Sequence, residues 1–224
     1  MKDLNSDGAH YDLQELAWEM AGRQRTGGAA LQSEARLPIG VYGVPAVVEY
    51  LPHNPEARRV AQALARLIAK RNAELQIEHI GSTAVPGCWG KGIIDLLVAY
   101  PAGSLRGARE TLDCLGFQRQ GGPEPFPESR PMRVGSFEYF GRSYRVHAHV
   151  IESGNAQAVN LLKFRDALRR DVDLRRAYEA EKRAILARGI TQGTEYSKAK
   201  GNFIQRASAT VPNVCEPPLL MSIK

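Results

Sequence analysis

The sequence predicts an α+β protein, with a β-sheet core followed by a helical C-terminal portion. Three observations predict this class. A helical pattern over residues 54–72 is followed by strand patterns at 75–80 and 93–100, which a glycine-rich loop connects. Two further strand patterns, at 134–140 and 143–152, are separated by a short turn. From residue 155 onward the apolar residues recur with helical periodicity.

The first 40 residues read as an accessory N-terminal arm. Residues 12–24 have the pattern of a short amphipathic helix, and residues 26–40 are rich in small residues, as linkers are. The main domain is expected over residues 41–210. We divide it into a sheet core, 41–153, and a helical part, 154–210, which an irregular tail, 211–224, follows.

The first helix of the domain is expected at residues 54–72. Asn54 can cap it, Pro55 suits its first position, and four apolar residues share one face: Val60, Leu64, Leu67 and Ile68. The alternating pattern of residues 75–80 predicts a half-buried strand, and the apolar run 93–100 predicts a fully buried one.

The elements that follow are assigned from their stops and turns. A helix over 104–116 has Ser104 as its cap and Gly116 as its stop. Residues 120–131 are too rich in proline and glycine for regular structure and are expected to form a mobile lid beside the site. A tight turn at Gly141 and Arg142 joins two antiparallel strands, and three helices are expected at 155–171, 172–189 and 194–208.

Bulk properties narrow the class of protein. The 224 residues carry a formal charge of +6, which either favours anionic partners or serves only solubility. Cys88, Cys114 and Cys215 lack metal-ligand or redox spacing, and no signal peptide or membrane-spanning run is visible. We expect a cytoplasmic protein with reduced thiols and no membrane partner. Nucleic acid is not favoured, because neither an aromatic platform nor a clustered basic stripe is visible.

Asp95 stands out because it interrupts the apolar run at 93–98. An unpaired buried charge costs several kcal/mol unless a metal, hydrogen bonds or a cation compensate it. The preceding loop begins with Gly81 and Ser82, whose backbone and hydroxyl can bind phosphate oxygens, while a nearby carboxylate can hold a cation that bridges them. Alternatively, Gly81 and Ser82 only make a turn. The arrangement is typical of phosphoryl or nucleotidyl transfer.

Six segments in a fixed order resemble the GrpB family, a branch of the nucleotidyltransferase-like superfamily. They are EHIGSTAVPG, KGIIDLLV, VHAHV, FRDALR, YEAEK and YSKAKGNFI, and the resemblance covers about residues 48–207. It implies a nucleotidyltransferase-like core of mixed β-sheet with flanking helices, followed by a helical C-terminal portion. It implies little about the substrate.

The chain departs from the superfamily pattern of two carboxylates separated by one residue, because Leu97 occupies the second position. Two-metal transfer is therefore in doubt. His147 and His149 are two residues apart on a strand and point to one face, so they are candidate metal ligands with Asp95. Mg²⁺ or Mn²⁺ is expected, and Zn²⁺ or another transition metal would suit the two imidazoles. Alternatively, the histidines line a polar groove.

Asp95 and His79 are the candidate catalytic residues. His79 lies two residues before Gly81 and either orients the loop through a hydrogen bond or acts as a general base. The candidate phosphate-binding residues combine the loop with cations from it and from the helices: Gly81, Ser82, Thr83, Lys91, Arg165, Lys182 and Lys200. Asp166 offers Arg165 a structural salt bridge instead.

The leading hypothesis is metal-dependent transfer of a nucleotidyl group to a small-molecule acceptor, with a nucleotide or another phosphorylated small molecule as partner. Two alternatives remain open. One is a noncatalytic nucleotide- or phosphate-binding domain, and the other is a small-molecule enzyme with a His/His/Asp metal centre. The sequence indicates neither the acceptor nor the oligomeric state.

Overall fold

The computed structural model describes residues 37–44, 47–122 and 124–210. Most of the expected arm, including the helix over 12–24, and the tail 211–224 lie outside the described residues. Residues 37–40 are described, and they pack on the domain: Ile39 is buried, and its N–H donates to the Leu115 carbonyl at 3.0 Å. Within the described residues, no helix is long and apolar enough to cross a membrane.

The core is a five-stranded sheet in the order β1-β2-β5-β4-β3. β2 and β5 pair in parallel, and every other neighbouring pair is antiparallel. The expected mixed sheet is therefore confirmed. The strands are β1 (Gln76–Ile80), β2 (Ile94–Tyr100), β3 (Gln118–Arg119), β4 (Met132–Tyr139) and β5 (Arg142–Glu152).

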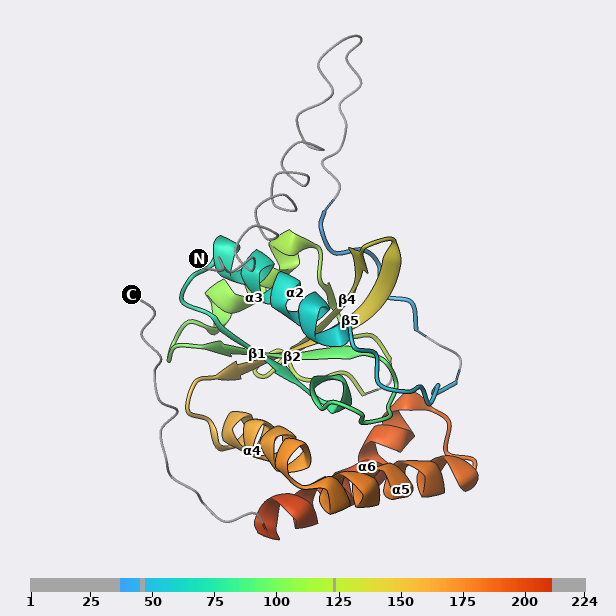
Figure 1. Cartoon of the computed structure of the whole chain (residues 1–224). Helices are drawn as coiled ribbons and strands as arrows, with labels where there is room; N and C mark the ends of the chain where they lie inside the picture. Colours follow the sequence, from blue (N-terminus) through green and yellow to red (C-terminus); the bar gives the residue numbers. More distant parts are fainter. Residues whose placement is uncertain (1–36, 45–46, 123, 211–224) are drawn as a thin grey trace, which may run out of the picture. The chain divides into compact units, whose positions relative to one another are not determined.

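Helices cover both faces of this sheet (Figure 1). On one face, α2 (Ala57–Arg71) and α3 (Leu105–Leu115) pack against the inward-facing residues of β2 and β5, such as Leu96 and Val146. On the other face lies α4 (Ala156–Arg170). Because side chains alternate along a strand, Asp95 and Leu97 point to the α4 face.

The C-terminal helices build a second layer on the α4 side. α5 (Val172–Ala187) begins at Asp171, whose carboxylate accepts from the N–H groups of Asp173 and Leu174. α6 (Gly193–Thr210) packs against α4 and α5. Apolar residues of these helices cluster with Val85 and Cys88 of the loop after β1, so this layer holds that loop in place.

Two expected boundaries are wrong by one or two residues. α2 begins at Ala57 rather than Pro55, although the Asn54 side chain still accepts from the Glu56 N–H at 3.0 Å. The β4–β5 turn is made by Phe140 and Gly141, with φ values of 47° and 72°. Positive φ at both central residues is the type I′ arrangement, whose twist matches that of the strands, and the exposed Phe140 adopts it without being glycine.

A buried ion cluster fixes the irregular segment 120–131. Arg133 on β4 is 0% exposed, and its guanidinium donates to the Asp113 carboxylate at 2.6 Å and to Glu128 at 3.0 Å. Glu128 lies in the segment that the sequence assigns to a mobile lid. The segment does lie beside the site, because Phe126 contacts the His149 ring at a centroid distance of 5.9 Å.

Replacing Arg133 with alanine should lower the free energy of unfolding by about 2–5 kcal/mol, because it empties the site of a fully buried side chain and removes its two ion pairs. Arg59→Ala is the matched control, since its pair with Glu56 is exposed and its loss should cost less than about 1 kcal/mol. Urea denaturation of both variants measures the difference. Equal losses would contradict the role of Arg133.

Candidate active site

Asp95, His147 and His149 meet on the α4 face of the sheet. In the parallel pairing of β2 with β5, Asp95 lies opposite His147 and Leu97 opposite His149. The Asp95 Oδ1 atom is 3.5 Å from His147 Nδ1 and 3.8 Å from His149 Nε2. The sheet register thus brings together the three residues that the sequence predicts as a site.

The two imidazoles keep Asp95 ionised. Burial would raise the pKa of Asp95, whose side chain is 25% exposed, but hydrogen bonding and charge from His147 and His149 outweigh burial and hold this pKa well below its usual range. For His147 burial is the larger effect, and its pKa is lowered despite the carboxylate. At neutral pH the site therefore holds a carboxylate beside a neutral His147.

The Tyr42 side chain contacts His147 on the side away from Asp95. The His147 Nε2 atom lies 2.8 Å from the Tyr42 hydroxyl, while Nδ1 faces Asp95. Because a carboxylate only accepts, we assign the imidazole proton to Nδ1, which leaves Nε2 to accept from the Tyr42 O–H. Tyr42, His147 and Asp95 thus form a chain along which a proton can move.

The glycine-rich loop touches the Asp95 carboxylate. Gly81 has φ 72°, and a Cβ atom there would overlap Asp95 Oδ2, so this position requires glycine for conformation and for space. The Ser82 hydroxyl is packed against Gly90 of the same loop, where a Cβ would overlap it. The loop backbone, more than the serine hydroxyl, faces the carboxylate.

Two lysines flank the site. Lys91 and Lys200 are half-buried, and their ammonium groups lie 5.8 and 5.6 Å from the Tyr196 ring centroid. Burial, strengthened by the charge of Lys91, lowers the pKa of Lys200 to about 8, and Asp95 opposes the shift. Burial also lowers the pKa of Lys91. The buried Tyr196 hydroxyl has no hydrogen-bond partner among the described residues.

His79 and Thr83 lie away from Asp95. His79 pairs with Leu96 across the β1–β2 ladder, so its ring points to the α2 face, opposite Asp95. Its Nε2 atom is 3.0 Å from Thr83 Oγ1, and the Thr83 hydroxyl donates to the Ile93 carbonyl at 2.9 Å. These contacts orient the loop, which is one of the two roles the sequence leaves open for His79.

Arg165 and Lys182 are engaged in structural contacts. Arg165 pairs with Glu78 at 2.7 Å and with Asp166 at 2.8 Å, as its structural alternative predicts. Lys182 is 2% exposed, and its ammonium contacts Cys88 Sγ at 3.4 Å and the Trp89 carbonyl. Both side chains secure β1 and the loop from the helical layer.

Comparison with known proteins places the chain in a family. A family model described as GrpB protein matches residues 46–210. The chain belongs to the GrpB protein family. Curated relatives in this family include a UPF0157 protein of Streptomyces coelicolor, 36% identical over 158 residues that cover 69% of this chain and 73% of the relative. Another, from Pseudomonas aeruginosa, is 33% identical over 178 residues, covering 78% of this chain and 72% of the relative.

The GrpB fold has also been solved. The crystal structure of GrpB from Enterococcus faecalis superposes with a TM-score of 0.55 at 21% identity, covering 72% of this chain and 95% of that one. This similarity establishes the fold alone. The Cid1 poly(U) polymerase in complex with its product ApU superposes with a TM-score of only 0.42 at 16% identity, covering 58% of this chain and 41% of that one, which carries no argument about function.

The donor set of this GrpB protein does not fit a two-metal centre. Leu97, at the position of the second carboxylate, is 1% exposed and packs with Ile80 and Ile151. Within the described residues, no group of three His, Cys, Asp or Glu side chains is arranged to hold a metal ion. His147 and His149 instead turn ring nitrogens toward the Asp95 carboxylate, so we derive no chemical step through a metal.

Sequence reasoning missed Tyr42, Phe126 and Arg133. Tyr42 reaches His147 across 105 positions of sequence, from a stretch without periodicity, so no local signal marks it. Phe126 lies in the Pro- and Gly-rich segment 120–131. Arg133 precedes the predicted strand 134–140, and only the pairing of β4 shows that its guanidinium is buried.

The stability of the protein should depend on pH through His79. Burial lowers the pKa of His79 from 6.5 to about 4, so the unfolded chain binds the proton first and stability falls as the pH drops from 6.5 to 4. The loss attributable to His79 should reach about 3 kcal/mol. His79→Gln, whose amide can donate to Thr83, should flatten the dependence in urea denaturation. An unchanged slope in the variant would contradict the assignment.

Proposed function

We propose that this GrpB protein is a nucleotidyltransferase-like enzyme, which transfers a nucleotidyl group from a nucleoside triphosphate to a small-molecule acceptor. The observation that carries the proposal is the setting of Asp95. An ionised carboxylate on a sheet face is touched by a glycine-rich loop and flanked by two partly buried lysines. A purely structural Asp95 would need the two imidazoles but neither the glycine contact nor the lysines.

In this proposal the glycine-rich loop and the two lysines bind the phosphates. Gly81 is exposed and lets a phosphate approach the backbone closely, and Lys91 and Lys200 lie where they can neutralise phosphate charge. The Tyr196 hydroxyl, which has no hydrogen-bond partner in the described part of the chain, belongs to the ring near both lysines and adds a donor for a phosphate or a bridging water. Transfer of this kind depends mainly on positioning and charge neutralisation.

The chain of Tyr42, His147 and Asp95 would activate the acceptor. The acceptor O–H or N–H gives its proton to the Tyr42 oxygen as Tyr42 passes its own proton to His147 Nε2. Asp95 stabilises the resulting imidazolium from the Nδ1 side. The acceptor atom then bonds to the α-phosphorus, the bond from that phosphorus to the bridging oxygen breaks, and pyrophosphate leaves.

A noncatalytic nucleotide-binding domain is the second candidate, and Leu97 favours it. The missing second carboxylate removes the usual two-metal clamp, while the glycine loop and the lysines remain. Such a domain would bind triphosphate without releasing pyrophosphate.

Pyrophosphate release and label transfer from α-labelled nucleoside triphosphates test the proposal. The assay would use a panel of small-molecule acceptors, with Mg²⁺, with Mn²⁺ and without metal. We expect turnover in the wild type and a loss of at least about 100-fold in Asp95→Asn, because the neutral amide cannot stabilise an imidazolium. Tyr42→Phe should lose turnover while triphosphate affinity is retained.

Two results would contradict this proposal. Binding of triphosphate with no turnover by the wild type would favour the noncatalytic domain, and equal turnover in Asp95→Asn would remove Asp95 from the chemistry. Lys70→Ala, on the exposed end of α2, is the matched control for a lost surface charge and should behave as the wild type.

The pH dependence of binding tests Lys200. Since the pKa of Lys200 is about 8, the cation is lost above that pH, and triphosphate affinity should fall roughly fivefold between pH 8 and 9. The phosphates stay ionised there, because their last pKa is about 6. Lys200→Arg keeps its charge and should give a flatter profile in isothermal titration. The same slope in both proteins would contradict a role for Lys200.

A further inference from the structure

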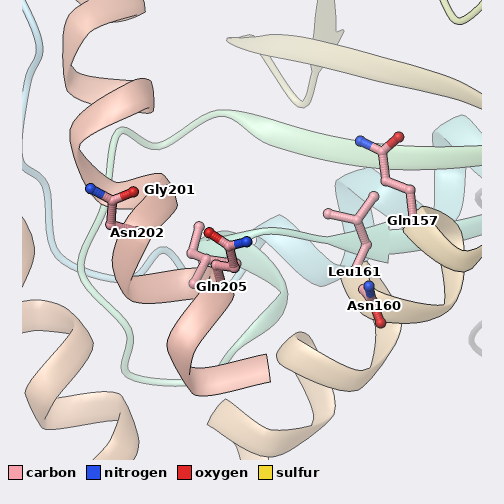
Figure 2. A pocket seen from close by; sticks show the side chains of 7 residues that line it. Gln157, Asn160, Leu161, Gly201, Asn202 and Gln205 are labelled. Atoms are coloured by element: carbon pink, nitrogen blue, oxygen red, sulfur yellow. The ribbon is translucent and has the colours of Figure 1, made fainter. Parts of the chain in front are cut away.

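A second pocket lies between α4 and α6 (Figure 2). Because α4 covers the face of the sheet to which Asp95 points, the pocket lies on that side. It has a volume of about 830 Å³. Most of its polar lining is carboxamide, contributed in pairs by the two helices: Gln157 and Asn160 from α4, and Asn202 and Gln205 from α6. Leu161 and Gly201 add apolar surface.

The carboxamides of this pocket are available to a ligand. Those of Asn160, Asn202 and Gln205 make no hydrogen bond within the described part of the chain, and only the Gln157 oxygen is engaged, by Arg130. Each carboxamide offers both donors and an acceptor. No side chain lining the pocket is charged. Such a lining suits a neutral ligand with hydroxyl, amide or ring-nitrogen groups and gives no compensation for phosphate charge.

The pocket adjoins the Asp95 site through two residues. Gln157 lines both the pocket and a small cavity that His149 and Phe126 also line. His149 Nε2 is in turn 3.8 Å from Asp95. On the other helix, Gly201 directly follows Lys200, which flanks the Asp95 site. Gln157 and Gly201 thus connect the pocket to residues that flank Asp95.

We propose that the α4–α6 pocket binds the acceptor, and that the acceptor is an uncharged, hydroxyl-rich molecule of nucleoside or sugar size. This proposal rests on the proposed function, in which the phosphates occupy the lysine side of the site. The division follows from charge, because lysines gather around Asp95 and Tyr196 while carboxamides line the pocket. Nucleosides and sugars share the hydrogen-bonding chemistry that these amides recognise.

Gly201 allows the pocket to be filled without straining the fold. A Cβ atom on Gly201 would meet nothing within 4 Å, and its φ is not left-handed, so Gly201→Phe should fold and occupy the space. Gly107 on α3 is equally open and lies on the opposite helical layer, which makes Gly107→Phe the matched control. Asn202→Leu with Gln205→Leu removes two carboxamides while keeping side-chain bulk.

Saturation-transfer NMR and titration with adenosine, uridine, glucose and trehalose would test the pocket in the full chain. We expect millimolar or tighter binding of at least one probe by the wild type, and a loss of at least tenfold in Gly201→Phe and in the double leucine variant. Gly107→Phe should bind as the wild type does. Binding of nucleosides alone or of sugars alone would identify the chemical class of the acceptor, and either result supports the proposal.

The proposal would be overturned if the wild type bound none of the four probes at concentrations up to about 10 mM. It would also be overturned if Gly201→Phe bound them with unchanged affinity. Triphosphate titration of the same variants separates this failure from that of the proposed function. If the wild type binds triphosphate and turns it over but binds none of the four probes, the pocket alone is overturned. If the wild type shows no turnover but binds a probe, and Gly201→Phe abolishes that binding, the proposed transferase activity is overturned. The pocket then still stands as a binding site.

Discussion

The interaction on which the site depends is the pairing of one buried carboxylate with two imidazoles across β2 and β5. Asp95 interrupts an otherwise apolar strand, and burial alone would raise its pKa. His147 and His149 reverse that preference because the parallel register aligns them with Asp95 and Leu97. A shift of one residue in this register would turn both histidines to the α2 face and leave the carboxylate without compensation.

The elements around Asp95 accommodate its charge. Gly81 gives the loop room to touch the carboxylate, and the lysines of the loop and of α6 approach it despite the cost of burial. Contacts from α4 and α5, through Arg165 and Lys182, hold β1 and the loop in position. The helical layer therefore contributes to the site both by supporting the loop and by supplying Lys200.

Local pattern was enough to predict the principal charge of the site and the helices and strands around it, although β3 was not predicted. Asp95 was visible because a carboxylate conflicts with an apolar run, and His147 and His149 because strand periodicity puts them on one face. Their convergence required the pairing of two strands about 50 residues apart, which resemblance to GrpB predicts and local pattern does not. Tyr42 and Arg133 were missed because their partners are set only by tertiary packing, and Lys182 resembled any helical lysine until its burial was known.

The most direct test of this account is the protonation state of Asp95, followed by carboxyl ¹³C NMR between pH 8 and 5 in wild type and in a His147→Ala, His149→Ala double variant. The account predicts an ionised carboxylate throughout this range in the wild type. In the double variant, where burial is no longer opposed, the pKa of Asp95 should rise into the measured range. Titration of Asp95 in the wild-type protein, or the absence of any change in the double variant, would contradict the claim that the two histidines hold the charge.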